Sequence, residues 1–206
     1  MTKFEFPPSI KSRPVYGTLA PRAGGQHLIV ADAEGAEAVF DLAKASPSMM
    51  AASHIIFIPK GSGDTYKAGL EALDAAQLYI GPSYEAATPR LRRTLQGAHM
   101  GLQVYLTGTE GLMGQAMYEA ISAGIPHSAI QTEHRGSVAR RMQCVHCKGI
   151  TEDVILDPFE CSHCGLNLFV RDHYSRRLAA FQGVCIDAED PGNVPASVTL
   201  YSDGEA

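Results

Sequence analysis

Two cysteine pairs in the last third of the chain have the spacing of metal ligands. Cys144 and Cys147 form one Cys-x-x-Cys turn, Cys161 and Cys164 form a second, and thirteen residues separate the two turns. Each turn directs two sulfurs at one point, and a spacer of this length allows a β-hairpin to return the second turn opposite the first. The four thiolates would then enclose a tetrahedral centre with no open position.

Zinc is the metal that this pattern favours, because it fills a closed thiolate site and needs nothing else from the protein. A rubredoxin-like iron centre is the alternative. Rubredoxins place their two turns much further apart and shield them with more aromatic residues, whereas the spacer here contains one aromatic residue, Phe159. His146 and His163 lie inside the turns, where the geometry directs them away from the metal, so we expect neither to be a ligand.

The competing interpretation is that the four cysteines form two disulfides or are four unrelated core cysteines. The residues after Met1 contain no apolar segment of a signal peptide, and no stretch approaches the ~20 apolar residues of a membrane span. We therefore expect a cytoplasmic protein, in which reducing conditions disfavour disulfides and favour metal binding. Cys185 lies outside the pattern and is expected to be a buried or unreactive thiol.

Composition limits the class of partner. The chain has 206 residues, of which 45% are hydrophobic, enough for one domain of moderate size and a small second module. Its formal net charge of -5 argues against nucleic acid, since phosphates require a basic face. Around the cysteines, basic and acidic residues are interleaved, which suits a protein partner better than a polyanion. These residues are Arg135, Arg140, Arg141, Arg171, Arg176, Arg177, Glu152, Asp153, Asp157, Glu160 and Asp172.

Short apolar runs alternate with helical segments over residues 27–136, which is typical of βαβ units. Thr88 as N-cap and Pro89 as first helical residue are expected to begin the third helix. The fold class is therefore α/β, with a doubly wound five-stranded parallel sheet followed by a small zinc-ribbon β-hairpin module. The predicted strands are 28–30, 54–58, 77–80, 102–106 and 129–132, and the predicted helices are 34–45, 66–76, 88–99 and 111–123.

Three further segments complete the predicted organisation. Residues 1–26 are rich in Pro and Gly and form an extended arm that is either disordered or lies on another subunit. Residues 137–187 hold the four-cysteine ribbon and a short helix over 174–183. Residues 188–206 form an irregular acidic tail.

The second half of the α/β domain resembles the nicotinamide-binding domain of the ferredoxin reductase superfamily. The resemblance lies in a strand ending in a glycine turn, a helix carrying a methionine, a Gly-Ile-Pro stop and a strand ending in a glutamate. It implies a nicotinamide site, which we expect to be vestigial, at Gly108, Thr109, Glu110, Met113 and Glu133.

The first half of the domain departs from that family. A phosphate-binding turn presents bare amides at a helix N-terminus, whereas this chain keeps Gly35 and adds Asp32, Glu34 and Glu37. Two like charges ~4 Å apart repel by roughly 1 kcal/mol in water and by more when partly desolvated. We therefore expect no useful affinity for a pyrophosphate. The loop at 60–63 is expected to be a surface turn rather than a phosphate-binding loop.

The chain as a whole resembles the DmmA-like subunit family of bacterial dimethylamine monooxygenase. The resemblance adds Asp172-His-Tyr-Ser-Arg-Arg-Leu178 and Ala180-Phe-Gln-Gly183 to the cysteine pattern. It implies a non-catalytic, zinc-containing subunit of an NAD(P)H-dependent haem monooxygenase that converts dimethylamine to methylamine and formaldehyde. Its partners would be haem-containing and reductase chains, which would carry most of the haem, FMN, iron-sulfur and NAD(P)H, and we expect neither nucleic acid nor a membrane as partner.

Three alternatives stay open at this point. The chain could be a nicotinamide- or flavin-binding electron-transfer subunit of the same complex, a rubredoxin-like iron carrier, or a zinc-ribbon protein that binds nucleic acid. No Ser/His/Asp arrangement or paired acid and base stands out, so no catalytic residue is predicted.

Overall fold

The structure is a computed structural model, and it describes residues 14–200. The chain divides into two compact units, one spanning Tyr16–Val138 and the other containing the chain from Ala139 onward. Each unit has its own five-stranded sheet and its own buried core. Over residues 14–200, no helix is both long enough and apolar enough to cross a membrane.

The first unit contains a parallel sheet with strand order β3-β2-β1-β4-β5. The central strands β1 and β4 pair in parallel, with Val30 opposite Leu106, and both are almost fully buried, as is typical of a parallel sheet covered on both faces. This topology confirms the expected α/β fold and all five of its strands. The strands are β1 (Gln26–Asp32), β2 (Ser53–Ile58), β3 (Gln77–Ile80), β4 (Leu102–Gly108) and β5 (Ile130–His134).

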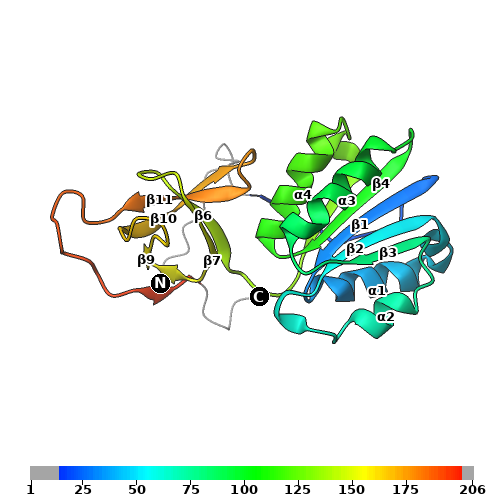
Figure 1. The fold of residues 1–206 in the computed structure, drawn as a ribbon, viewed down its shortest axis with the longest axis horizontal. Helices are drawn as coiled ribbons and strands as arrows, with labels where there is room; N and C mark the ends of the chain where they lie inside the picture. Colours follow the sequence, from blue (N-terminus) through cyan, green and yellow to red (C-terminus); the bar gives the residue numbers. More distant parts are fainter. Residues whose placement is uncertain (1–13, 201–206) are drawn as a thin grey trace. The chain divides into compact units, whose positions relative to one another are not determined.

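Helices cover both faces of this sheet, with α1 and α2 on one face and α3 and α4 on the other (Figure 1). Successive residues of β1 point to opposite faces, so Leu28 packs into the core beneath α3 and α4, while Ile29 packs into the core beneath α1. The helices are α1 (Gly35–Ala45), α2 (Lys67–Glu71), α3 (Tyr84–Gln96) and α4 (Glu110–Ser122), with short 3-10 turns at Pro47–Ala52, Lys60–Ser62 and His127–Ala129.

Helix α3 begins at Tyr84, five residues before the predicted first helical residue Pro89, so the assignment of Thr88 as N-cap was wrong. Ser83 is the N-cap, and its Oγ accepts a hydrogen bond of 3.3 Å from the backbone N–H of Ala86. Pro89 lies inside the helix. A proline there costs one backbone hydrogen bond, and the extra turn is capped by Ser83 and buries Ala87 in the core.

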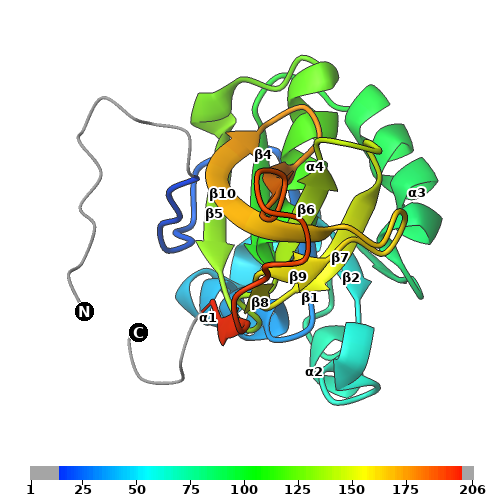
Figure 2. The same ribbon diagram turned by 90° about the vertical axis from the view of Figure 1, so that its left-hand side faces the viewer.

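The second unit contains a mixed sheet with strand order β7-β6-β11-β10-β9 (Figure 2). Its core is small and includes Met142, Leu168 and Phe181. The expected irregular tail contains one short strand, β12 (Val198–Thr199), which pairs with β8 (Leu156–Asp157). The other strands are β6 (Arg140–Cys144), β7 (Ile150–Val154), β9 (Phe159–Glu160), β10 (Asn167–Ser175) and β11 (Ala180–Cys185).

The short helix predicted over 174–183 is wrong, because these residues form the end of β10, a turn and most of β11. Strand β11 is paired on both sides, antiparallel with β10 and parallel with β6. Tyr174 packs on Phe181, with ring centroids 4.9 Å apart. A Cβ at Gly183 would lie 2.9 Å from atoms of Leu168 and Phe159, so Gly183 permits close packing here rather than ending a helix.

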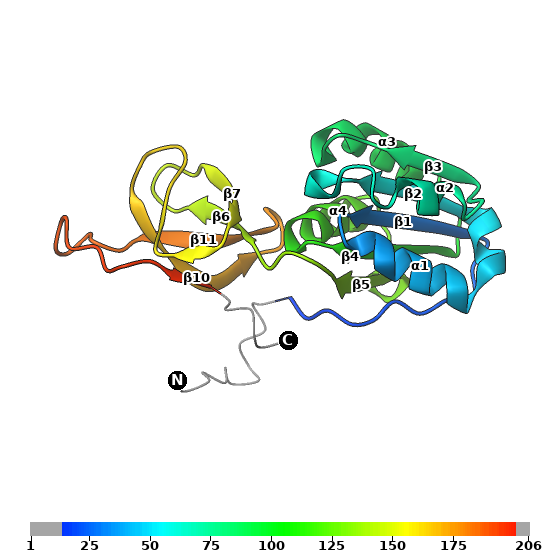
Figure 3. The ribbon, with the colours of Figure 1, turned by 90° about the horizontal axis from the view of Figure 1, so that it is seen from below.

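The described part of the predicted arm, residues 14–25, is extended and runs beside β5 (Figure 3). The N–H of Gly17 donates to the carbonyl of Thr132 at 2.9 Å, and Ala20 exchanges two hydrogen bonds with the side chain of Gln131. These residues therefore cover an edge of their own sheet. Contact of the arm with another subunit stays a prediction, and the part of the arm before Pro14 is outside the described residues.

Gly108, at the end of β4, provides a test of how closely β4 approaches Asp32 at the end of β1. Its φ is +115°, and a Cβ there would lie 1.9 Å from Oδ1 of Asp32. We expect Gly108→Ala to lower the free energy of unfolding by about 2–4 kcal/mol, from backbone strain and overpacking together. Gly124→Ala has a φ of +88° but no neighbour within 4 Å, so it should cost only about 1 kcal/mol. Urea titrations followed by circular dichroism compare the two, and equal losses would contradict the close approach.

Candidate metal centre and the crevice beside β1 and β4

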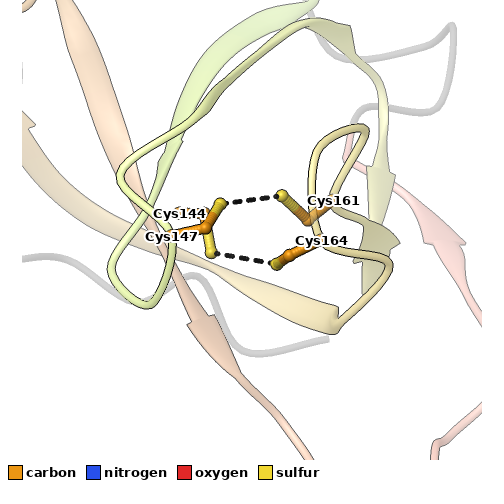
Figure 4. Close-up of side chains that lie close together, drawn as sticks. All are labelled: Cys144, Cys147, Cys161 and Cys164. Atoms are coloured by element: carbon orange, nitrogen blue, oxygen red, sulfur yellow. Dashed lines mark hydrogen bonds between the residues drawn. The ribbon is translucent and has the colours of Figure 1, made fainter.

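The structure brings all four predicted cysteine ligands together (Figure 4). Their sulfur atoms all lie within 4.8 Å of one another. The Sγ atoms of Cys144 and Cys164 are 3.9 Å apart, and those of Cys147 and Cys161 are 3.7 Å apart. Four sulfurs at about 2.3 Å from one metal ion form a tetrahedron with edges of about 3.8 Å. The sulfur arrangement therefore fits a single tetrahedral ion.

The two cysteine turns share one backbone design. In the first, the N–H of Lys148 donates to the carbonyl of Cys144 at 3.0 Å; in the second, the N–H of Gly165 donates to the carbonyl of Cys161 at 2.9 Å. Lys148 and Gly165 both have positive φ, of 64° and 71°. Each turn thereby reverses the chain directly after its second cysteine, so both sulfurs of a pair face the same point.

Backbone N–H groups stabilise the thiolate form of the buried ligand Cys161. Burial raises the pKa of this thiol, but hydrogen bonds from the backbone of His163 and Cys164, together with those from the thiols of Cys164 and Cys147, outweigh burial and lower the pKa to about 6. The N–H of Gly149 donates to Sγ of Cys147 at 3.4 Å. Ionised sulfurs this close together repel one another, and a bound cation removes that repulsion.

Neighbouring candidate ligands lie outside the cluster. Nε2 of His163 is 2.8 Å from the carbonyl oxygen of Ile150, and a hydrogen bond there holds the ring away from the sulfurs. His146 is not part of the sulfur cluster either. Cys185 donates to Oδ1 of Asp187 at 3.1 Å, and this hydrogen bond raises the pKa of the thiol.

The centre can support structure or electron transfer, but not Lewis-acid catalysis. Four protein sulfurs fill a tetrahedral coordination shell and leave no position for a substrate. Both zinc and iron accept four thiolates in this geometry. The first turn is also attached to β11, because Cys144 lies opposite Gly183 and the N–H of Val145 donates to the Gly183 carbonyl at 3.0 Å.

The crevice at the carboxyl ends of β1 and β4 is the switch point of the parallel sheet, where α/β proteins commonly bind ligands. Here it contains Asp32, whose side chain is fully buried. Its Oδ1 accepts a hydrogen bond of 2.7 Å from the N–H of Thr109, and its Oδ2 accepts one of 2.6 Å from the Thr109 hydroxyl. Nζ of Lys60 lies 3.3 Å from the same carboxylate. A carboxylate of the chain itself therefore occupies both donors of Thr109, the N-cap of α4.

Sequence reasoning assigned Asp32 a different role and missed Lys60. Asp32 was expected to repel a pyrophosphate, whereas it binds Thr109, and Lys60 was expected in a surface turn. The ends of β1 and β2 are adjacent in a parallel sheet, so a lysine directly after β2 could have been recognised as a partner for an aspartate ending β1. Glu37 lies in the first turn of α1 and accepts a hydrogen bond of 3.2 Å from Tyr66.

The other residues of the predicted nicotinamide site lie near this crevice, and their polar groups have partners within the chain. Glu110 accepts a hydrogen bond of 2.8 Å from the hydroxyl of Tyr16. Glu133 accepts one of 2.6 Å from the N–H of Leu19 and one of 2.7 Å from Nε of Arg135. Met113 is 1% exposed and belongs to the core. Sequence reasoning missed this role of the arm, because contacts between residues 16–19 and the strand ends leave no local pattern.

The metal centre can be tested by removing one ligand. We expect the wild-type chain to bind one metal ion, and Cys161→Ser to lose it together with the thermal transition of the second unit, because metal binding to four thiolates is coupled to folding. Elemental analysis and scanning calorimetry measure both effects. Cys185→Ser is the matched control and should keep the metal; a metal-loaded, fully stable Cys161→Ser variant would contradict the assignment.

The role of Asp32 gives a separate test. Asp32→Ala leaves the buried N–H of Thr109 without its acceptor, so we expect a loss of about 2–4 kcal/mol in the free energy of unfolding. Glu37→Gln removes an exposed acid from the same region, and should change stability by less than about 0.5 kcal/mol. Denaturant titration compares the two variants. Similar stabilities would show that the carboxylate does not support α4.

Comparisons with known proteins were made over the whole chain. Residues 8–130 match the N-terminal domain, and residues 141–184 the C-terminal domain, of the dimethylamine monooxygenase subunit DmmA-like family. The heme-dependent oxidative N-demethylase delta subunit of Ectopseudomonas mendocina (strain ymp) is 31% identical over 147 residues, which cover 68% of this chain and 84% of that protein.

Two solved structures share part of the fold. Phthalate dioxygenase reductase, described as a modular structure for electron transfer from pyridine nucleotides to [2Fe-2S], has a TM-score of 0.46 at 12% identity, over 69% of this chain and 47% of that one. Flavohemoglobin from Malassezia yamatoensis, with bound FAD and heme, has a TM-score of 0.36 at 13% identity, over 55% of this chain and 32% of that one. The chain thus spans less than half of either structure. The two family matches together span most of its length, and the chain belongs to the DmmA-like family of dimethylamine monooxygenase subunits.

Proposed function

We propose that this chain is a non-catalytic, zinc-containing subunit of a multicomponent, NAD(P)H-dependent monooxygenase that oxidises dimethylamine to methylamine and formaldehyde. The family assignment and the similarity to a delta subunit of a heme-dependent oxidative N-demethylase support membership of such a complex. The closed four-sulfur centre supports a structural role for the metal.

The observation that carries the non-catalytic assignment is the contact between Asp32 and Thr109. A nucleotide phosphate at this end of the sheet would need the N–H and hydroxyl that Asp32 already holds at 2.7 and 2.6 Å. It would also approach a buried negative charge. Residues of the arm also bond two further residues of the predicted site: the hydroxyl of Tyr16 donates to Glu110, and the N–H of Leu19 donates to Glu133. The predicted nicotinamide site at Gly108, Thr109, Glu110, Met113 and Glu133 is therefore proposed to be vestigial.

The chemistry would then take place on other chains. We assign haem, FMN, the iron-sulfur cluster and NAD(P)H mainly to partner subunits, namely a haem-containing chain and a reductase chain in the cytoplasm. This chain would position those partners through surfaces of its second unit. Nucleic acid and membranes are not among the proposed partners.

An electron-carrying role is the second candidate, because four sulfurs in a tetrahedron also suit iron. The two interpretations predict different colours for the purified protein. A purified chain with one zinc ion and no visible absorption supports the structural role, and a red, iron-loaded chain would replace it with an electron carrier. Elemental analysis and an absorption spectrum decide between them.

Nucleotide binding is tested by titrating NADH and NADPH into the purified chain in a calorimeter. We expect no heat of binding, because the donors of the crevice are occupied. Dissociation constants in the micromolar range would overturn the non-catalytic assignment and favour a nicotinamide-binding electron-transfer subunit.

Assembly is tested with the ligand variant in the complete complex. Since the metal organises the unit proposed to contact the partners, Cys161→Ser should dissociate the complex rather than only slow its turnover. Size-exclusion chromatography of the co-expressed subunits measures this. Cys185→Ser should assemble normally, and an intact complex that contains metal-free Cys161→Ser would contradict the proposed role of the metal.

A further inference from the structure

A group of exposed basic residues, three arginines and one histidine, lies on the hairpin of β10 and β11. Arg171, Arg176 and Arg177 are exposed, and so is His173. The sequence from His173 to Ile186 contains no Asp or Glu. We call these four side chains the basic hairpin.

The two arginines of the turn, Arg176 and Arg177, differ from four other arginines of the chain that each pair with an acidic residue. Arg92 pairs with Glu119 at 2.7 Å, and Arg140 pairs with Asp172 at 3.0 Å. Arg176 and Arg177 form no ion pair with any carboxylate of residues 14–200. Two neighbouring guanidinium groups repel each other, so this arrangement gains stability when an acidic group approaches.

The hairpin contains one acidic residue, Asp172, and this residue forms an ion pair with Arg140. Asp172 is half-buried and paired with Arg140, which is 5% exposed and whose guanidinium also lies 4.5 Å from the centre of the Phe181 ring. Asp172 is therefore engaged beneath the hairpin and does not offset the charge of Arg176 and Arg177. The outward field of the basic hairpin is positive, although the chain as a whole has a net charge of -5.

The hairpin is held in one conformation at both ends. Near the turn, the rings of Tyr174 and Phe181 pack at a tilt of 60°, with centroids 4.9 Å apart. At its base, Gly183 lies opposite Cys144 and accepts a hydrogen bond from Val145, inside the first cysteine turn. Closing the metal centre thus fixes the register of β11. A surface ordered before binding loses less entropy when a partner docks.

We propose that the basic hairpin is a docking surface for an acidic patch on a protein partner, and that the metal centre positions it. The proposal rests on the proposed function, because that partner is another subunit of the complex. Arginine is enriched at protein interfaces, where its guanidinium binds carboxylates through two hydrogen bonds. The acids that follow the hairpin, Asp187, Glu189 and Asp190, would repel an extended polyanion, so nucleic acid fits this surface less well than a local acidic patch.

The experiment reverses the charge of the hairpin in the full chain. Arg176→Glu/Arg177→Glu is co-expressed with the other subunits, and the dissociation constant is measured by light scattering over a series of NaCl concentrations. We expect affinity to fall at least tenfold at physiological salt, and the salt dependence to weaken. Lys67→Glu/Arg93→Glu is the control, because both residues are exposed on the first unit and the change in net charge is the same. Both variants must keep wild-type metal content and circular dichroism.

The outcomes separate the inference from the function on which it rests. If the wild-type complex assembles and both double variants assemble equally well, the docking surface is wrong and the proposed function stands. If the wild-type chain binds no other subunit, the proposed function fails and the inference fails with it. Retention of the wild-type chain on DNA that is lost in Arg176→Glu/Arg177→Glu would assign the hairpin to nucleic acid and overturn the protein docking surface.

Discussion

Four cysteine sulfurs within 4.8 Å of one another organise the second unit of this chain. That unit has a core of only a few buried residues, among them Met142, Leu168 and Phe181. Such a core supplies little stability by itself. A metal ion bound by four thiolates contributes on the order of 10 kcal/mol of apparent binding energy. We therefore expect the small sheet to depend on the metal centre, and the exposed hairpin of β10 and β11 to depend on the sheet.

In the first unit, a buried aspartate and a lysine lie together at the carboxyl end of the sheet. The N-terminus of α4 offers an N–H and a hydroxyl from Thr109 to a negative group. In this chain the negative group is Asp32, which is buried and lies 3.3 Å from the ammonium of Lys60. An acidic side chain of the chain itself thus accepts the hydrogen bonds that an anion would accept, and these bonds stabilise the junction of β4 and α4. In the proposed function, this internal carboxylate takes the position of a ligand phosphate.

The arm extends this pattern to the neighbouring strand end. Leu19 and Tyr16 direct their donors at Glu133 and Glu110, which the sequence associates with a nicotinamide site. Covering the edge of β5 also protects the sheet from pairing with other chains. In the proposed complex, both effects suit a subunit whose first unit holds its shape while its second unit contacts partners.

The sequence by itself determined the α/β class, the five parallel strands, the family and the four cysteines, because each has a local signature: hydrophobic runs of fixed length, or ligands at fixed spacing. The tertiary structure decided the rest. Residues 174–183 form strands because β11 is paired on both sides. Helix α3 begins at Tyr84, where Ser83 caps it and the added turn places Ala87 in the core. Asp32 became an internal ligand because the ends of β1, β2 and β4 meet at one edge. Contacts between residues far apart in the sequence decide each of these features, and such contacts leave no periodic pattern in the chain.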